Sequence, residues 1–227
     1  MRLFCFPHAG AGTLPYRSWS GSLEGVAVCP ALLPGRETRL GEPALDNMRQ
    51  LIDALTVAIK PFLDVPFAFF GHSMGAGMAF ELARYLRRAG APGPGVLVVS
   101  AARAPQLRVH QPGPEPSDEE LMDELQRLHG GERQILELAL PALRADTRLY
   151  RNYRYEPEPP LSIPIFAYGG ATDPSIRPEH LDGWHDQTTG SFTRREFPGG
   201  HFYLQTERAM FLASLNEDLQ AGVTRDS

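Results

Sequence analysis

The residue of this chain best suited to chemistry is Ser73, which lies in the pentapeptide Gly71–Gly75, GHSMG. A serine hydroxyl is a weak nucleophile at neutral pH, so it needs a general base within hydrogen-bond reach and a carboxylate that orients the base. The glycines two residues before and after Ser73 lack the side chains that a tight turn would exclude. An apolar run, Pro66–Phe70, precedes the pentapeptide and an amphipathic stretch, Ala76–Arg88, follows it. The pattern predicts a nucleophilic serine on a sharp turn between a strand and a helix.

His201 is the best candidate for the general base among the seven histidines. It follows the strand-like run Ser191–Phe197 through a Pro-Gly-Gly turn and immediately precedes the last predicted helix. That order puts His201 in a loop at the carboxyl end of the final strand, the edge at which ligands bind in open sheets of alternating strands and helices. The other histidines precede the serine, lie in a helical insertion or fall on a predicted helix. We therefore expect His201 to take the proton of Ser73.

Asp173 is the candidate for the carboxylate that orients the base. The strand-like run Ile163–Tyr168 leads through Gly-Gly-Ala-Thr into Asp173, and Pro174 restricts the chain immediately afterwards. An aspartate that merely caps a turn or helix is the alternative interpretation. The end of another strand-like run, Gly95–Ser100, is a second place for such a carboxylate, but it continues as Ala-Ala-Arg. We therefore expect Asp173 to hold His201.

The elements that must position these residues alternate along the chain. Strand-like runs at Arg2–Phe6 and Gly25–Leu33 precede the serine turn, and apolar residues recur every three or four positions from Leu45 to Phe62, which predicts a helix. Further helices are expected over about Pro178–Gln187 and Tyr203–Leu219. Alternating strands and helices imply right-handed crossovers and a mostly parallel sheet covered on both faces. Together with the serine turn, this order predicts an α/β fold of the α/β-hydrolase type.

The segment from about residue 105 to residue 160 interrupts the alternation, because it contains no strand pattern. Ser117 and Glu120, three residues apart, predict a capping box at the start of a helix. The insertion comes after the strand that follows Ser73, so we predict a helical lid over the active site within a single domain, residues 1–227; a solvent-facing embellishment is the alternative. The helices expected in it cover Ser117–His129, Glu132–Ala139 and Pro141–Tyr150.

Bulk composition excludes several classes of function. The 227 residues are 42% hydrophobic and 22% charged, which is ordinary for one globular domain. A net charge of −5 gives no support for a nucleic-acid surface. No apolar run approaches the length of a membrane span, and no spacing of cysteine or histidine suggests a metal site. The chain opens directly into a strand-like run, so we expect no signal peptide and a cytoplasmic enzyme, monomeric by default at this size.

Backbone N–H groups must stabilise the oxyanion that forms when a serine attacks a carbonyl. One is expected from Met74, the residue after the nucleophile, and the other from the loop His8–Gly12 that follows the first strand-like run. Small residues in that loop let the backbone approach a substrate carbonyl closely, and Ala9 is the best candidate for the donor. His8 is expected to orient the loop or the ester, or simply to pack against the loop.

With these pieces assigned, the whole chain resembles the type II thioesterases that accompany polyketide and nonribosomal peptide synthases. The resemblance implies hydrolysis of stalled or wrongly loaded acyl groups from the phosphopantetheine arm of acyl or peptidyl carrier proteins, with no metal or organic cofactor of the enzyme's own. The matching blocks are Leu3–Gly10 (LFCFPHAG), Leu33–Glu37 (LPGRE), Phe70–Ala76 (FGHSMGA), Leu140–Asp146 (LPALRAD) and Pro198–Tyr203 (PGGHFY).

The resemblance also directs attention to substrate-binding residues. Arg36 is expected to contact the arm or to brace the lid, with an ordinary salt bridge as the alternative. Leu143 is expected to line an acyl chamber beneath the insertion, although core packing explains a leucine equally well. An acidic carrier protein would need a local arginine patch on this acidic enzyme, and most of the candidate arginines are also explained as solvated surface. These candidates are Arg84, Arg87, Arg88, Arg103, Arg108, Arg148, Arg151 and Arg154.

Three other functions remain open from the sequence. A small-molecule carboxylesterase or lipase would share Ser73, Asp173 and His201, so only its substrates distinguish it. A chain-terminating thioesterase that releases a finished product is a second alternative, which a short chain without a carrier-domain linker disfavours. A catalytically silent partner that only binds carrier proteins is a third, and an intact set of three catalytic residues argues against it.

Overall fold

The computed structural model describes residues 1–108, 114–129 and 136–223. Its centre is one six-stranded sheet in which every neighbouring pair of strands is parallel. The spatial order is β2-β1-β3-β4-β5-β6, and the α/β class predicted from the alternation is confirmed. The strands are β1 (Arg2–Phe6), β2 (Ala27–Pro30), β3 (Phe67–His72), β4 (Val96–Ser100), β5 (Ile165–Gly170) and β6 (Phe192–Phe197).

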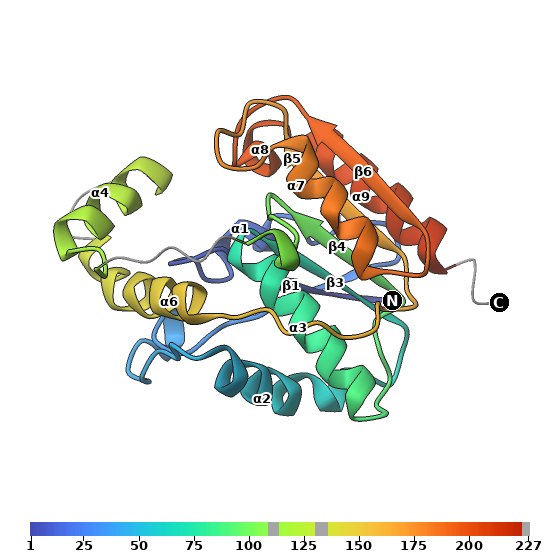
Figure 1. Cartoon of the computed structure of the whole chain (residues 1–227), viewed down its shortest axis with the longest axis horizontal. Coiled ribbons are helices and arrows are strands. Elements are labelled where there is room, and N and C mark those ends of the chain that lie inside the picture. The colour runs from blue at the N-terminus through green and yellow to red at the C-terminus, as the bar shows by residue number, and fades with distance from the viewer. Residues whose placement is uncertain (109–113, 130–135, 224–227) are drawn as a thin grey trace.

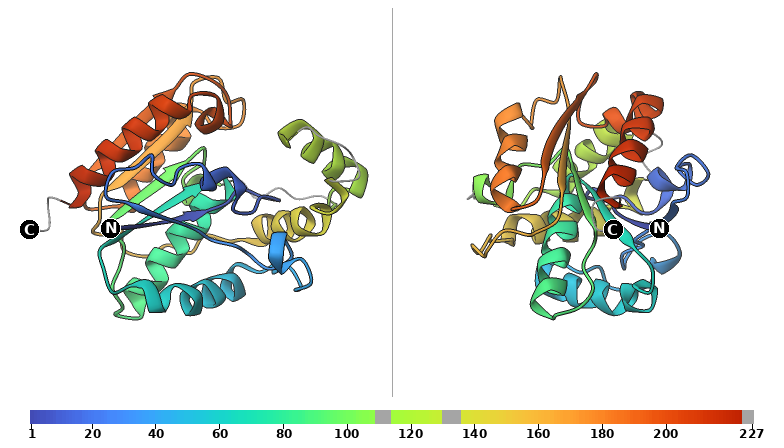
Figure 2. Two further views of the ribbon diagram at one scale, coloured as in Figure 1. Left: turned by 180° about the vertical axis from the view of Figure 1, so that it is seen from behind. Right: turned by 90° about the vertical axis from the view of Figure 1, so that its right-hand side faces the viewer.

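Helices cover both faces of the sheet (Figure 2). The central strands β3, β4 and β5 are buried along their whole length, as expected of parallel strands between two helical layers. One face packs against α2 (Met48–Ile59), α3 (Met74–Arg88) and the segment containing α7 (Pro178–Asp182). The other face packs against α1 (Leu14–Arg17), α8 (Tyr203–Thr206) and α9 (Arg208–Val223).

Local sequence explains where α2 begins and ends. The side chain of Asn47 caps the helix by accepting a hydrogen bond from the N–H of Gln50 at 3.2 Å. A short 3-10 turn, Lys60–Phe62, follows the helix, and Pro61 within it cannot continue an α-helical ladder. The buried residues of α2 recur at helical spacing, so its apolar stripe packs onto the sheet. They are Leu51, Ile52, Leu55 and Ile59.

Two predicted helices differ from the structure. The expected continuous helix Tyr203–Leu219 is wrong, because α8 ends at Thr206 and α9 begins at Arg208. Tyr203 of α8 and Phe211 of α9 are both buried in the same core, so both helices pack on this face of the sheet. The helix expected over Pro178–Gln187 is α-helical only to Asp182 and continues as a 3-10 helix, Gly183–Gln187.

The insertion contributes a 3-10 turn, Pro105–Leu107, and the helices α4 (Asp118–His129) and α6 (Leu140–Asn152). The predicted capping box is present, since Ser117 Oγ accepts from the N–H of Glu120 and the Glu120 carboxylate accepts from the N–H of Ser117. Half of the helix expected over Glu132–Ala139 lies outside the described residues. Figure 1 shows α4 and α6 beyond the carboxyl ends of the strands. They pack on each other through Leu121, Met122 and Leu143, and Leu136 from the segment between them joins this cluster.

None of the helices in the described ranges combines the length and the apolar character needed to cross a bilayer.

Candidate active site

Ser73 lies on the turn between β3 and α3 in a conformation that L-residues rarely adopt, with φ 55° and ψ −117°. The glycines two residues before and two residues after Ser73 are both required, because a side chain at either position would clash with the backbone. A Cβ at Gly71 would lie 2.1 Å from the carbonyl oxygen of Gly75, and a Cβ at Gly75 would lie 2.1 Å from the carbonyl oxygen of Phe6. The N–H of Ser73 donates to the carbonyl of Ser100 at 2.8 Å, which ties the turn to the end of β4. The serine is therefore held at the carboxyl edge of the sheet and at the N-terminus of α3.

Asp173 and His201 are hydrogen-bonded, with His201 Nδ1 2.6 Å from Asp173 Oδ2. The side chain of Asp173 is fully buried and that of His201 is 24% exposed. The N–H of Ser175 donates to the other carboxylate oxygen at 2.8 Å. Burial raises the pKa of Asp173, but the hydrogen bond and charge of His201, together with the N–H groups of Ser175 and Ile176, outweigh it and hold this pKa below its usual value. An ionised carboxylate can only accept, so Nδ1 of His201 carries the proton and Nε2 is left to act as a base.

The loops after β5 and β6 are in direct backbone contact, which brings these two residues together. The N–H groups of Ala171 and Thr172 donate to the carbonyls of Phe197 and Gly199 at 2.8 and 2.9 Å. A Cβ at Gly170 would lie 2.1 Å from the carbonyl oxygen of Gly200, so only glycine permits this approach. Parallel pairing of β5 with β6 thus fixes the spacing between acid and base.

A cavity of about 820 Å³ opens where these elements meet, and Ser73, Asp173 and His201 all line it. Three further predicted residues, His8, Ala9 and Leu143, line it as well. The insertion contributes much of the wall, from the segment 114–116 and from α4 and α6. Lining residues that sequence reasoning did not single out include Ala101, Tyr150, Ile176 and Phe202. Aromatic and branched side chains carry no local signal of their position, so only the assembled fold identifies them.

The two predicted oxyanion donors differ in what surrounds them. Met74 is the first residue of α3, where the helix leaves the N–H without an intrahelical acceptor. Ala9 lies on the cavity wall, and the amides that follow it are already engaged. The N–H of Gly10 donates to Asp146 and the N–H of Ala11 donates to the carbonyl of His8. Among the described residues, no acceptor bonds the N–H of Ala9, so it is available to a ligand.

Arg36 does not line the cavity; its guanidinium is buried in an ion pair with Asp146 of α6. Nη1 and Nη2 donate to the two carboxylate oxygens at 2.8 and 2.9 Å, and Nη1 also donates to the carbonyl of Ala11. Asp146 accepts in addition from the N–H of Gly10 at 2.8 Å. The pair is a salt bridge, the alternative considered from the sequence, and it joins the loop after β2 to α6 of the insertion. The partner was missed because it is distant in the chain.

A buried polar chain lies beneath His201. His72 Nδ1 is 2.8 Å from Ser100 Oγ, which in turn is 2.5 Å from the hydroxyl of Tyr203. The rings of His72 and His201 have centroids 5.2 Å apart. Burial, with the nearby His201 and His8, holds the pKa of His72 well below its usual value, so this imidazole stays neutral. His72, which directly precedes Ser73 in the sequence, thus packs against the candidate base.

No group of three or more histidine, cysteine, aspartate or glutamate side chains in the described part of the chain is arranged to hold a metal ion.

Comparison with known proteins extends the similarity over nearly the whole chain. The thioesterase domain family matches residues 1–219. The gramicidin S biosynthesis protein GrsT of Aneurinibacillus migulanus is 37% identical over 90% of this chain and 83% of its own length. The RedJ thioesterase of the prodiginine pathway of Streptomyces coelicolor superposes with a TM-score of 0.89 at 41% identity, covering 95% of this chain and 84% of that one. The type II thioesterase BorB of the borrelidin cluster gives 0.88 at 38% identity, covering 96% and 92%. The chain therefore belongs to the thioesterase domain family and, within its α/β-hydrolase fold, to the type II editing thioesterases.

Proposed function

We propose that this thioesterase hydrolyses acyl groups from the phosphopantetheine arm of carrier proteins in a nonribosomal peptide or polyketide system. The relatives support the assignment to a biosynthetic system of this kind. GrsT is named for gramicidin S biosynthesis, and BorB comes from the borrelidin biosynthetic cluster. The observation that carries the chemistry is the 2.6 Å hydrogen bond between Asp173 and His201 on the wall of the cavity that also contains Ser73. Clearing of stalled or wrongly loaded acyl groups is the corresponding role.

In the first half-reaction, Ser73 Oγ attacks the thioester carbonyl while Nε2 of His201 takes its proton. The resulting imidazolium is stabilised by the ionised Asp173. The N–H groups of Met74 and Ala9 stabilise the oxyanion of the tetrahedral intermediate. When the intermediate collapses, the carbon–sulfur bond breaks and the thiol of the arm leaves with the proton from His201. An acyl-serine ester remains on the enzyme.

In the second half-reaction, water replaces the thiol. The oxygen of the water attacks the acyl-serine carbonyl while His201 takes a proton from the water. The N–H groups of Met74 and Ala9 hold the new oxyanion. Collapse of this intermediate returns the proton to Ser73 Oγ and releases the acid. Neither half-reaction changes an oxidation state, and every proton that moves passes through His201.

We also propose that the insertion, residues 105–160, acts as the lid of this site. Its supporting observation is the cavity wall, where Leu121 of α4 and Leu143 and Tyr150 of α6 lie on the same cavity as Ser73. An apolar wall beside the nucleophile suits a short acyl chain, since burial of its methylene groups contributes about 0.8 kcal/mol each. Leu143 then limits the length of the acyl chain that the enzyme accepts.

The test is loss of acyl groups from acetyl-, propionyl- and longer acyl-carrier proteins, followed by intact-protein mass spectrometry. Wild type and Ser73→Ala are compared, with acyl-N-acetylcysteamine thioesters and p-nitrophenyl esters run in parallel. We expect hydrolysis of the carrier-bound thioesters that depends on Ser73 and exceeds the hydrolysis of the small esters. Efficient turnover of p-nitrophenyl esters with untouched carrier proteins would instead identify a carboxylesterase.

A further inference from the structure

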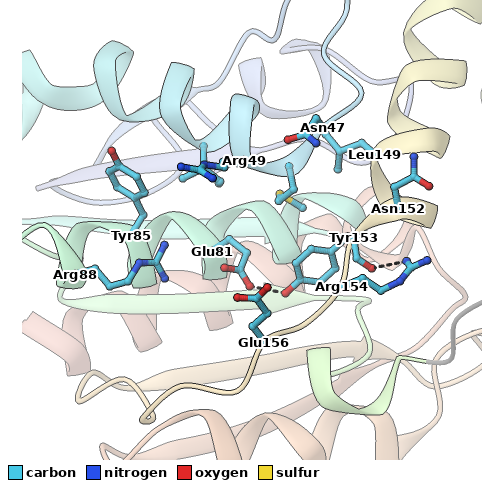
Figure 3. Close-up of a pocket in the computed structure, with 12 residues that line it drawn as sticks. Asn47, Arg49, Glu81, Tyr85, Arg88, Leu149, Asn152, Tyr153, Arg154 and Glu156 are labelled. Atoms are coloured by element: carbon cyan, nitrogen blue, oxygen red, sulfur yellow. Dashed lines mark hydrogen bonds between the residues drawn. The ribbon is translucent and has the colours of Figure 1, made fainter.

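Two more cavities of similar size lie outside the catalytic residues, and their charges differ. The first, of about 410 Å³, lies between α2, α3 and the end of α6 (Figure 3). Its lining carries both signs of charge, and Tyr153 donates to Glu81, which also pairs with Arg84. Because its lining carries both signs of charge, this cavity has no clear preference for an anion or for a cation.

The second cavity has a volume of about 440 Å³, and all the charged side chains that line it are arginines. Four arginines and three tyrosines line it, and none of its lining residues is an aspartate or a glutamate. We refer to it as the arginine pocket, after Arg103, Arg108, Arg151 and Arg154. A lining of this composition suits an anion, because guanidinium groups are positively charged and donate several hydrogen bonds each.

The arginine pocket adjoins the active-site cavity. Tyr150, Ser175 and Ile176 line both cavities. Ser175 lies two residues after Asp173 and its N–H donates to that carboxylate. The two cavities are therefore neighbours, and these three residues form part of both walls.

Arg108 is held in a fixed position in the pocket without a carboxylate partner among the described residues. Its guanidinium carbon lies 3.6 Å from the centroid of the Tyr150 ring and 5.0 Å from that of Tyr153. Nη2 donates to the carbonyl of Tyr150 at 2.7 Å. Burial lowers the pKa of Arg108, and the positive charges of Arg154 and Arg103 lower it further. A buried cation beside other cations is unfavourable unless an anion compensates it.

Arg103 supplies a second guanidinium at the same place. It lies at the end of β4, in the segment that leads into the insertion, and it is only partly exposed. Within residues 1–108, 114–129 and 136–223, no carboxylate forms an ion pair with it. The structure thus holds at least two arginines, Arg103 and Arg108, in a pocket next to the active-site cavity, and no described carboxylate compensates their charges.

We propose that the arginine pocket binds the phosphodiester that joins the pantetheine arm to its carrier protein. This inference rests on the proposed function, in which the arm carries the thioester at one end and the phosphodiester at the other. Arg103 and Arg108 hold the phosphodiester by charge-assisted hydrogen bonds while the thioester reaches Ser73. The pocket therefore recognises the phosphate group of the arm rather than the surface of the carrier protein.

The test uses propionyl thioesters of increasing completeness: propionyl-N-acetylcysteamine, propionyl-pantetheine, propionyl-4′-phosphopantetheine and propionyl-carrier protein. The quantity measured is kcat/KM for the phosphorylated arm divided by kcat/KM for pantetheine. We expect this ratio to exceed one in the wild type and to fall about tenfold in Arg103→Gln, since a hydrogen bond to a charged group contributes enough for that factor. Arg108→Gln should lower the ratio by a similar factor. Arg103→Lys, which keeps the charge, should give a ratio between those of Arg103→Gln and the wild type.

Arg88→Gln is the matched control, because Arg88 lines the other cavity and its charge is paired with Glu158. It leaves the ratio unchanged. Thermal melts of all variants exclude misfolding as the cause of any loss. The inference is overturned if the wild type shows no preference for the phosphorylated arm. It is also overturned if Arg103→Gln slows only the carrier-protein substrate, because the arginines then contact protein. Failure of the wild type to hydrolyse any pantetheine or carrier thioester would overturn the proposed function itself.

Discussion

Replacement of Asp146 by asparagine tests how the insertion is attached to the catalytic loops. Asp146 lies on α6 and is 1% exposed, and its partner Arg36, 5% exposed, lies in the loop after β2. The carboxylate accepts two hydrogen bonds from Arg36 and one from the N–H of Gly10, next to Ala9. One side chain thus joins the insertion to the loop that supplies a proposed oxyanion donor. Asparagine keeps the shape but loses the charge and one acceptor oxygen.

The expected loss follows from the burial of both charges. Removing one partner of a buried pair leaves the other charge uncompensated and costs about 3–5 kcal/mol. Because asparagine still accepts one hydrogen bond, we expect the lower end, about 3 kcal/mol of unfolding free energy. In a chain of this length, that corresponds to a melting temperature lower by about 10 °C. We also expect kcat to fall about tenfold, since the loop carrying Ala9 loses an anchor, while removal of an oxyanion donor outright costs more.

Urea denaturation and thioester hydrolysis measure these two effects. Arg148→Gln is the control on the same helix, because Arg148 pairs with Glu115 at the surface, with side chains 40% and 53% exposed. An exposed pair contributes less than about 1 kcal/mol. The double variant Arg36→Met with Asp146→Leu removes both charges and should regain much of the lost stability. If Asp146→Asn is no less stable than Arg148→Gln, the bracing role assigned to this ion pair is refuted.

Three further predictions follow from the site. Asp173→Asn removes the acceptor that fixes the tautomer of His201, so kcat for a propionyl thioester should fall roughly 10⁴-fold at pH 7; retention of a tenth of the activity would contradict the assigned role. Gly75→Ala places a Cβ 2.1 Å from a backbone oxygen, and urea denaturation should show a loss of about 3 kcal/mol or more, whereas Gly77→Ala, with open space around its Cβ, is the control. The depressed pKa of His72 means that the unfolded chain protonates first as pH falls below about 6.5, so stability that is present above that pH is lost toward the folded-state pKa. Between pH 6.5 and 5.5 the wild type should lose about 1 kcal/mol more than His72→Gln, and equal slopes in urea titrations would contradict this.

The local features of this protein were predictable from short stretches of sequence. The strand–turn–helix around Ser73 was recognised because both glycines are needed within the turn itself, and the structure shows the same contacts. The capping box of Ser117 and Glu120 involves residues three apart, so its hydrogen bonds follow from local geometry. Alternation of apolar runs with helical periodicity was sufficient for the α/β class, because each element buries one face in a regular pattern.

Chain order alone also singled out Asp173 and His201, since the strand ends of a parallel sheet lie along one edge. Their actual contact depends on the approach of two glycine-containing loops, which pairing of β5 and β6 decides. The sequence by itself therefore determined the class of fold, the serine turn and the order of the catalytic candidates. Tertiary structure decided that Arg36 braces Asp146, 110 residues away, and that arginines from two segments of the insertion share a pocket beside Ser175. Such contacts leave no periodic trace, because they depend on how whole elements pack rather than on the neighbours of each residue along the chain.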